Sequence, residues 1–344
     1  MTSAPPFWSP ERHAARRPAL LIRTKLKTAL RAALEAKRFM EVDTGLIQIS
    51  PGNETHLHAF ETTWRAPGED SVTGYLITSP EFAMKKLLAA GEAHIYQFAP
   101  CFRAREISRL HSPEFTMLEF YRANESYTEL MQDCAWILRL AARIGKRDTL
   151  TYRGRECDHY AEPERLSVCA AFARHAGIEL EPLLKDRDAF AAAALDRGIR
   201  VALDDTWSDI FSRVMVEKVE PHLGVGRATI LDRYPVSEAA LARPCPEDPR
   251  FAERFEFYVC GIELANAFGE LTDAAEQRRR FEADMAEKQR LYGETYPLDE
   301  DFLAALPLMP PACGMALGFD RLAMLAAGVE NIEDVLFTPW PLAV

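Results

Sequence analysis

Cysteine is scarce in this chain, and its spacing excludes the sites that cysteine usually builds. The 344 residues contain seven cysteines, and no two of them form a Cys-x-x-Cys pair. The sequence therefore predicts neither a zinc knuckle nor a disulfide framework, and it fits a reducing compartment.

Long apolar runs are also missing. No stretch is long enough to span a bilayer, and the first residues, MTSAPPFWSPERHAARRP, lack the continuous apolar core of a signal peptide. Apolar residues make up 48% of the chain and charged residues 27%, which is ordinary for a globular protein of one large domain or two smaller ones. We expect a cytoplasmic protein without membrane association.

Positive charge is in deficit, with 41 Lys and Arg against 52 Asp and Glu and a formal net charge of −11. This balance argues against a protein whose main work is to grip a nucleic-acid backbone. Residues 1–40 are an exception, with nine Lys and Arg against Glu11 and Glu35. That segment is either a solvated helix face or a docking surface for an acidic partner.

The first part of the chain alternates helix and strand signals. Residues 1–18 are rich in proline and are expected to be disordered, as an N-terminal extension. Residues 19–38 have helical periodicity, and FMEVDT (39–44) reads as a strand. Ser79-Pro80-Glu81 is typical of a helix start, with a capping serine, a proline in the first turn and an acidic residue near the positive end; Gly91 closes this helix.

Two strands around a polar loop follow. HIYQFAPCFR (94–103) alternates as a strand. The stretch HSPEFTMLEFY (111–121) contains the second strand, beginning at Glu114. Because strand side chains repeat every two residues, one of its faces carries a ring, a thioether, a carboxylate and a phenol: Phe115, Met117, Glu119 and Tyr121.

The rest of the chain indicates an α+β fold. Ser126 with Glu129 predicts a capping box for a helix that ends near Gly145, and residues 150–220 look helical without a readable motif. The remaining elements are strands in RATILDRYP and FEFYVCGIELANAF, a charged helix from about Thr272 to Tyr292, and a strand–helix unit in GMALGFDRLAMLAAG. Strands joined by loops and hairpins, with helices between them, favour an antiparallel sheet flanked by helices over a βαβ series.

Five ordered segments resemble the motifs of one enzyme family. Arg103 at the end of the first strand, with HSPEFTMLEFY on the second, closely resembles motif 2 of the class II aminoacyl-tRNA synthetases, lysyl branch. The other matching segments are FMEVDT for motif 1, GMALGFDRL (314–322) for motif 3, and TSPE (78–81) and ELANAFGEL (263–271) for lysyl-type signatures. The resemblance covers about residues 19–340 and implies a class II synthetase catalytic core.

One domain of that family has no room in this sequence. Lysyl-tRNA synthetases carry an anticodon-binding barrel before motif 1, and here motif 1 begins almost at once. We therefore expect a single catalytic domain over residues 19–344, without an anticodon-binding domain. Such a stand-alone core resembles the elongation factor P–(R)-β-lysine ligases, which activate β-lysine with ATP and transfer it to a lysine side chain of elongation factor P.

The resemblance implies roles in ATP binding. Arg103 matches the motif 2 arginine that holds the α-phosphate and stabilises the charge that develops there. Arg321 matches the motif 3 arginine on the γ-phosphate, and Phe115 matches the aromatic residue that stacks on adenine. The implied catalytic pair is Arg103 and Arg321, and the implied ATP site comprises Arg103, Ala104, Arg105, Ser112, Phe115, Glu263, Leu264, Gly318 and Arg321.

Further roles concern the amino acid and a metal ion. Glu119, Tyr121 and Glu270 match the groups that receive the ε-ammonium of lysine, and Glu81 matches the residue that binds the other amino group. A cation on a long alkyl stem needs a carboxylate at the bottom of a partly apolar slot. The implied substrate site comprises Ser79, Pro80, Glu81, Glu119, Tyr121, Glu270 and Ala316.

The implied Mg²⁺ ligands are Glu256 and Glu263, whose hard oxygens suit that ion. They stand an odd number of residues apart, so a straight strand would put them on opposite faces. We therefore expect a turn or bulge at Cys260-Gly261. Taken alone, Glu81 is an ordinary helix N-terminal acid, Phe115 a core residue and Arg321 a surface ion-pair residue; only the common register makes them a site.

The sequence departs from the family pattern at several positions. Gly45 replaces a proline after motif 1, and Ala104-Arg105-Glu106 puts the loop glutamate one place late, so adenine recognition by this loop is in question. Ser112, Ala267 and Gly269 are further replacements, and none removes a charge that the chemistry needs. Ala316 stands where lysyl-tRNA synthetases have glycine and the ligase family has alanine.

Three functions compete at this point. The first is the ligase acting on elongation factor P, as a homodimer that does not bind tRNA stably. The second is a lysine-activating enzyme that charges tRNA or another acceptor, against which the negative charge and the missing barrel argue. The third is a non-catalytic synthetase paralogue, which has no need of paired phosphate arginines.

Overall fold

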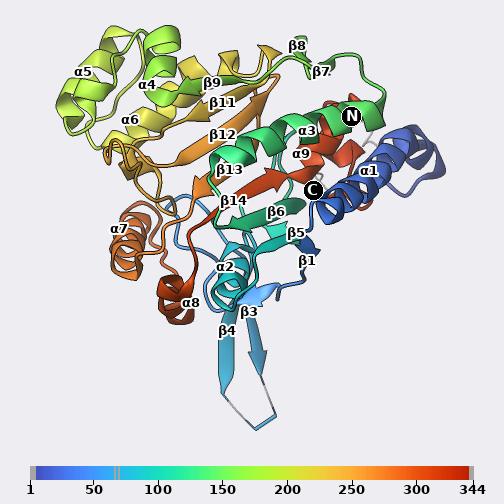
Figure 1. The fold of residues 1–344 in the computed structure, drawn as a ribbon, viewed down its shortest axis with the longest axis horizontal. Helices are drawn as coiled ribbons and strands as arrows, with labels where there is room; N and C mark the ends of the chain where they lie inside the picture. The colour runs from blue at the N-terminus through green and yellow to red at the C-terminus, as the bar shows by residue number, and fades with distance from the viewer. Residues whose placement is uncertain (1–4, 66, 69, 341–344) are drawn as a thin grey trace.

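A mostly antiparallel sheet organises the computed structural model, which describes residues 5–65, 67–68 and 70–340 (Figure 1). Within these residues it has eight strands: β1 (Met40–Glu41), β5 (His94–Phe102), β6 (Glu114–Ala123), β14 (Ala312–Gly318), β13 (Ile262–Gly269), β12 (Arg254–Val259), β11 (Thr229–Asp232) and β9 (Glu164–Ser167), in that spatial order. Neighbours are antiparallel except the edge pairs β1–β5 and β11–β9. The expected α+β fold is confirmed.

Alternation along β6 separates a core face from a site face. Leu118 and Phe120 enter the main apolar core, whereas Met117 packs in a separate small cluster on the other face. Helices α1 (Pro10–Ala36), α3 (Thr128–Gly145) and α9 (Phe319–Ala327) contact one another and supply the main core (Figure 1). The opposite face of β6 is thereby left to the site.

Helix α1 begins earlier than the sequence analysis expected. The Ser9 side chain accepts a hydrogen bond from the Arg12 backbone amide, and Pro10 occupies the first turn. The expectation of disorder over residues 1–18 is therefore wrong for residues 10–18, where the Ser-Pro start signal was overlooked. Residues 1–4 lie outside the described part of the chain.

Several basic side chains of the first forty residues are used inside the molecule. Arg12 pairs with Glu333 at 3.0 Å, Arg23 with Asp320 at 2.8 Å, and Arg31 with Glu41 at 2.8 Å. These pairs bind α1 to the body, so the segment is not a purely solvated face. Arg17, Lys25 and Arg38 are exposed, and a docking surface for an acidic partner stays a prediction.

A second group of helices lies on the side of the sheet away from α1, α3 and α9 (Figure 1). It comprises α2 (Glu81–Ala89), α7 (Ala274–Tyr292) and α8 (Glu300–Ala305), joined through Phe82, Phe281 and Phe302 (Figure 1). The Phe82 and Phe302 rings are stacked with centroids 4.2 Å apart. Helix α7 matches the expected charged helix, but α2 has Pro80 rather than Ser79 as its N-cap residue and no side-chain cap.

Two further expectations are corrected in the middle of the chain. Tyr127, not Ser126, precedes α3, and the Ser126 hydroxyl accepts from the Thr128 amide at 3.3 Å instead of closing a capping box with Glu129. Residues 150–220 are only partly helical, because they begin with the strands β7 (Leu150–Tyr152), β8 (Arg155–Asp158) and β9. The helices are α4 (Val168–Ala171), α5 (Arg187–Asp196) and α6 (Trp207–Val214), with π-helical turns at Phe172–Ala176 and Met215–Val219, around a core of their own.

Small sheets complete the fold. Strands β3 (Glu61–Arg65) and β4 (Ser71–Leu76) form a hairpin that projects from the body (Figure 1), and β2 (Ile47–Gln48) pairs with β4. In the other small sheet, β10 (Gly226–Arg227) pairs with β8, which pairs with β7. Strands β12 and β13 meet at Cys260-Gly261, where both residues have positive φ, and their register shifts between Phe257 and Tyr258. The expected turn at Cys260-Gly261 is confirmed. No described helix is long and apolar enough to cross a membrane.

Candidate active site

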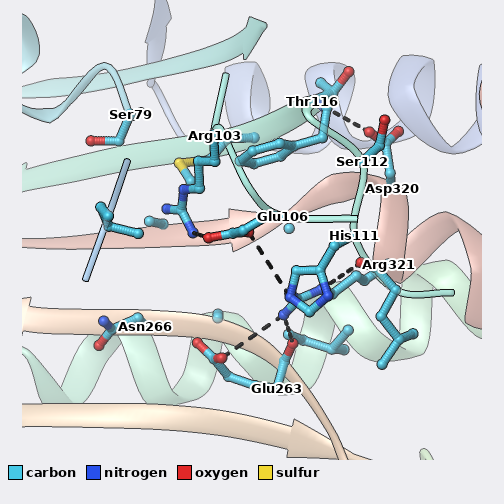
Figure 2. A pocket seen from close by; sticks show the side chains of 18 of the residues that line it. Ser79, Arg103, Glu106, His111, Ser112, Thr116, Glu263, Asn266, Asp320 and Arg321 are labelled. Carbon is cyan, nitrogen blue, oxygen red and sulfur yellow. Dashed lines mark hydrogen bonds and ion pairs between the residues drawn. The ribbon is translucent and has the colours of Figure 1, made fainter. Parts of the chain in front are cut away.

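A cavity of about 300 Å³ opens on the site face of the sheet (Figure 2). Its walls come from β6, β13, β14, the starts of α2 and α9, Arg103 just beyond β5 and the loop that leads from there to β6, and Glu54 and Leu57 also line it. Of the site residues expected from the sequence, it is lined by Ser79, Glu81, Arg103, Ser112, Phe115, Glu263, Leu264, Ala316, Gly318 and Arg321. The fold thus gathers residues from segments far apart in the chain into one space.

Arg103 enters the cavity from just beyond β5. Its Nε donates to the Thr78 carbonyl oxygen at 3.4 Å, and its guanidinium lies 5.3 Å from the centroid of the Phe115 ring. Glu106 lies 3.9 Å away (Figure 2). Arg103 is only partly neutralised by these contacts, so it offers donors to an anion in the cavity.

Arg321 enters from the first turn of α9. Its Nη1 donates to the Glu263 carbonyl oxygen at 2.8 Å and its Nε to the Leu110 carbonyl oxygen at 3.3 Å. Its Nη2 lies 2.6 Å from Nε2 of His111 (Figure 2). Two permanently charged arginines therefore reach one cavity from different elements, which suits a polyphosphate.

The loop after β5 places Ala104 and Arg105 outside the cavity, contrary to the expected site. Arg105 has a left-handed backbone with φ of 69°, and its side chain forms an ion pair with Glu294 outside the cavity. The Ala104 amide donates to the His58 carbonyl oxygen at 2.7 Å, and neither residue lines the cavity. Because Arg105 turns outward, Glu106 faces the cavity although it stands one place late in the sequence.

Four buried groups form an acidic end beneath Glu81. Lys85 Nζ lies 2.5 Å from Glu81 Oε1 and 2.6 Å from Glu270 Oε2. The Tyr121 hydroxyl donates to Glu119 Oε1. Glu119 and Glu270 are only 1% and 2% exposed, and Glu119 Oε2 and Glu270 Oε1 have no hydrogen-bond partner among the described residues. Buried carboxylate oxygens without a partner are costly, which indicates a place for a cation.

The charge state of this acidic end is unusual. Burial, together with repulsion by Glu81, raises the pKa of Glu119 well above its ordinary value, although the Tyr121 hydrogen bond and Lys85 oppose this. Burial also raises the pKa of Glu270 to about 7, despite the attraction of Lys85. A bound ammonium group would favour the ionised form of both carboxylates.

Strand β14 shapes the same region. Ala316 lies opposite Glu119, and Gly314 lies opposite Tyr121. A Cβ atom on Gly314 would stand 2.3 Å from the Tyr121 ring and 2.6 Å from Glu270 Oε1. Glycine is therefore required for the phenol and the carboxylate to fit beside this strand.

The two expected metal ligands differ in placement. Glu263 lines the cavity, but Glu256 does not; Tyr234, Tyr258 and Arg254 donate to its oxygens at 2.5, 2.6 and 2.6 Å. Burial and repulsion by Glu256 raise the pKa of Glu263 to about 7, while Arg321 lowers it. A divalent cation would relieve this repulsion, and Glu263 offers it a hard oxygen donor in the cavity. Glu256 is already held by its three donors, and the described residues contain no group of three or more candidate ligands.

Comparison with known proteins agrees with this geometry. Residues 9–341 match the model of the class II tRNA synthetases (D, K and N). The chain belongs to this family. Among curated relatives of this class II synthetase, "Elongation factor P--(R)-beta-lysine ligase" of Proteus mirabilis is 39% identical over 96% of this chain and 97% of its own length. The protein of the same name from Haemophilus influenzae is 39% identical over 92% and 93% of the two chains. The family expected from the motifs is confirmed.

Some residues of this class II site were not among the site residues expected from the sequence, although Glu106 was noted as a displaced loop glutamate. Glu106 and His111 line the cavity, Gly314 makes room beside Tyr121, and Lys85 joins two expected substrate residues. The i,i+4 spacing of Glu81 and Lys85 was a signal that could have been used. Pro80 precedes α2 without lining the cavity, and Tyr121, Glu119 and Glu270 lie beneath its floor.

Proposed function

We propose that this class II synthetase homologue is an ATP-dependent, AMP-forming ligase that activates (R)-β-lysine as its adenylate and transfers it to a lysine side chain of elongation factor P. Full-length similarity to relatives that carry this name supports the proposal. The observation that carries it is a cavity lined by two arginines and by Glu81, with buried carboxylate oxygens of Glu119 and Glu270 beneath its floor that have no hydrogen-bond partner among the described residues.

In the activation step, the substrate carboxylate reacts with ATP near the two arginines while the amino groups of the substrate are held at the acidic end. The substrate carboxylate attacks the α-phosphorus of ATP, the bond to the β-phosphate breaks, and pyrophosphate leaves. Arg103 stabilises negative charge on the α-phosphate, and Arg321, held by the carbonyl oxygens of Glu263 and Leu110, binds the leaving phosphates. Glu263, with Glu256 behind it, would hold Mg²⁺, which neutralises phosphate charge when bound.

The acidic end holds the substrate while this happens. Glu119 and Glu270 receive the terminal ammonium group, and Glu81 receives the amino group nearer the carboxylate. In the second step the acceptor lysine amine attacks the acyl carbon, an amide bond forms and AMP leaves with the bonding electron pair.

Three finer features belong to the same proposal. The net charge of −11 supports a protein acceptor rather than stable tRNA binding. All seven cysteines lie in the described part of the chain and are unpaired, which fits action in the cytoplasm. We further propose a homodimer formed through the motif 1 elements α1 and β1.

Mass spectrometry of elongation factor P tests the proposal directly. The acceptor is incubated with the enzyme, ATP and either (R)-β-lysine or α-lysine, and we expect a mass increase of one lysyl group with β-lysine. Arg103→Ala serves as the inactive control. Transfer of a lysine isomer to tRNA and none to elongation factor P would replace this proposal with a tRNA-charging enzyme, and no ATP–pyrophosphate exchange with any isomer would indicate a non-catalytic paralogue.

A further inference from the structure

The one lysine at the acidic end of the cavity has no role in the chemistry described so far. Lys85 is 1% exposed and lies in α2, one helical turn after Glu81. Its ammonium group is within 2.5 Å of Glu81 Oε1 and 2.6 Å of Glu270 Oε2. It therefore bridges a carboxylate that lines the cavity and one that lies beneath its floor.

We infer that Lys85 is a positioning residue, a permanent buried countercharge that orients Glu81 and Glu270 and fits the acidic end to two substrate ammonium groups. The inference rests on the proposed function and adds a determinant of substrate class: a carboxylic acid with two amino groups.

The charge balance supports this role. Glu81, Glu119 and Glu270 carry three negative charges when ionised, and Lys85 carries one positive charge, which leaves two negative charges for the ligand. Glu119 Oε2 and Glu270 Oε1 remain without a hydrogen-bond partner among the described residues. Lys85 therefore leaves these carboxylate oxygens free to accept hydrogen bonds from a substrate ammonium group. Without Lys85, two ammonium groups would leave one buried carboxylate unpaired, which is costly.

Lys85 could instead be a stand-in that occupies the substrate's place and leaves when the ligand binds. The packing of α2 argues against this, because the neighbouring Met84 and Leu88 are also fully buried. Attraction by Glu270 and Glu81 outweighs the effect of burial and raises the pKa of Lys85, so its charge persists at neutral pH. A charged side chain that is 1% exposed and paired with two carboxylates is held where it lies.

The surroundings of Lys85 set the expected pH dependence. The titratable and charged groups around it are Glu81 on α2, Glu119 and Tyr121 on β6, and Glu270 after β13, with Arg243 and Cys313 next to Glu270. In a variant without Lys85, a proton shared by the carboxylates can replace the missing charge at low pH only. The loss of affinity should therefore grow as the pH rises.

Calorimetric binding of (R)-β-lysine, without ATP, tests the inference. We expect Lys85→Met and Lys85→Ala to bind at least about tenfold more weakly at pH 8 than the wild type, with a smaller loss at pH 6. Lys86→Met is the matched control, because Lys86 is the next residue of α2 but is partly exposed and pairs with Asp299 and Asp301, away from the carboxylates of the acidic end. This control should bind as the wild type does.

Chemical rescue separates a charge effect from a loss of packing. Lys85→Ala removes a propylammonium group, so added propylammonium chloride should restore (R)-β-lysine binding with saturation at one site, whereas 1-propanol should not. Propylammonium should leave wild-type affinity unchanged. If Lys85→Ala unfolds, as thermal melting would show, the pH-dependent loss in Lys85→Met carries the test.

The outcomes are distinct. Wild-type protein that binds no diamino acid would defeat the proposed function itself. Wild-type binding with unchanged or tighter binding in the Lys85 variants would overturn the inference, because tighter binding is the mark of a stand-in. Equal rescue by propylammonium and 1-propanol would overturn the inference, because it would mean that Lys85 only fills space and that its charge is not needed.

Discussion

The Nη2 atom of Arg321 lies 2.6 Å from the Nε2 atom of His111. An arginine can only donate, so His111 must accept through Nε2 and carry its proton on Nδ1, which then donates to Ser108 Oγ at 2.7 Å. Burial and the positive charge of Arg321 lower the pKa of His111, which favours this neutral form. His111 therefore holds Arg321, the proposed phosphate-binding arginine, in place without adding charge.

Removing that acceptor should weaken ATP binding. We expect His111→Ala to raise the KM for ATP in pyrophosphate exchange by about tenfold or more, because a hydrogen bond to a charged group contributes roughly 1.5–3 kcal/mol. His111→Gln keeps an acceptor and should remain closer to the wild type. An unchanged KM in His111→Ala would mean that the backbone carbonyl oxygens alone hold Arg321.

Two arginines of the same loop should behave in opposite ways. Arg103 faces the cavity, whereas Arg105 pairs with Glu294 outside it. Arg103→Ala should slow pyrophosphate exchange by about 10²–10³-fold through lost stabilisation of transition-state charge. Arg105→Ala, the matched control, should retain most activity. Near-normal exchange in Arg103→Ala would remove this arginine from the mechanism.

The sequence was informative where a function depends on a contiguous motif. Arg103, Phe115 and Arg321 could be placed in one site because they lie in register with motifs 2 and 3. The turn at Cys260-Gly261 followed from the odd spacing of Glu256 and Glu263, since strand faces alternate.

The missed features depend on geometry that no single motif contains. Lys85 reads as one half of an exposed i,i+4 pair, and only its burial against Glu270 shows otherwise. Glu106 rather than Arg105 faces the cavity because the backbone of Arg105 is left-handed, and this φ angle cannot be read from the sequence. The hairpin β3–β4 carried no motif at all.

Binding of a diamino acid should release protons near neutral pH. Burial raises the pKa of Glu270 to about 7, so this group is about half protonated at pH 7 without ligand. An ammonium group beside it lowers that pKa, so a proton leaves on binding and affinity rises from pH 6 to pH 8. Calorimetry in buffers of different ionisation enthalpy measures the release. Glu270→Gln should reduce it; wild-type binding without proton release would contradict the shift.

The proposed dimer uses the edge of the main sheet. β1 is the terminal strand beside β5, so its outer backbone groups are free to pair with a second chain, and Met40 on it is 46% exposed. Light scattering at micromolar concentration should give the mass of two chains, and Met40→Arg should shift the mass toward one chain without lowering the thermal stability of the monomer. A single-chain mass for the wild type would refute the dimer.

Ala316 should set the choice between lysine isomers. It lines the cavity on β14, directly opposite Glu119, and packs against the small cluster that contains Met117. Its methyl group is expected to crowd the α-amino group of ordinary lysine, while β-lysine, whose amino group is one carbon further along, still reaches Glu81. One methyl group in a pocket is worth roughly 1–3 kcal/mol, or about 10- to 200-fold in discrimination. Ala316→Gly should therefore improve kcat/KM for α-lysine relative to β-lysine by about that factor. The measurement is kcat/KM for both isomers in wild type and variant, and an unchanged ratio would mean that Ala316 only packs.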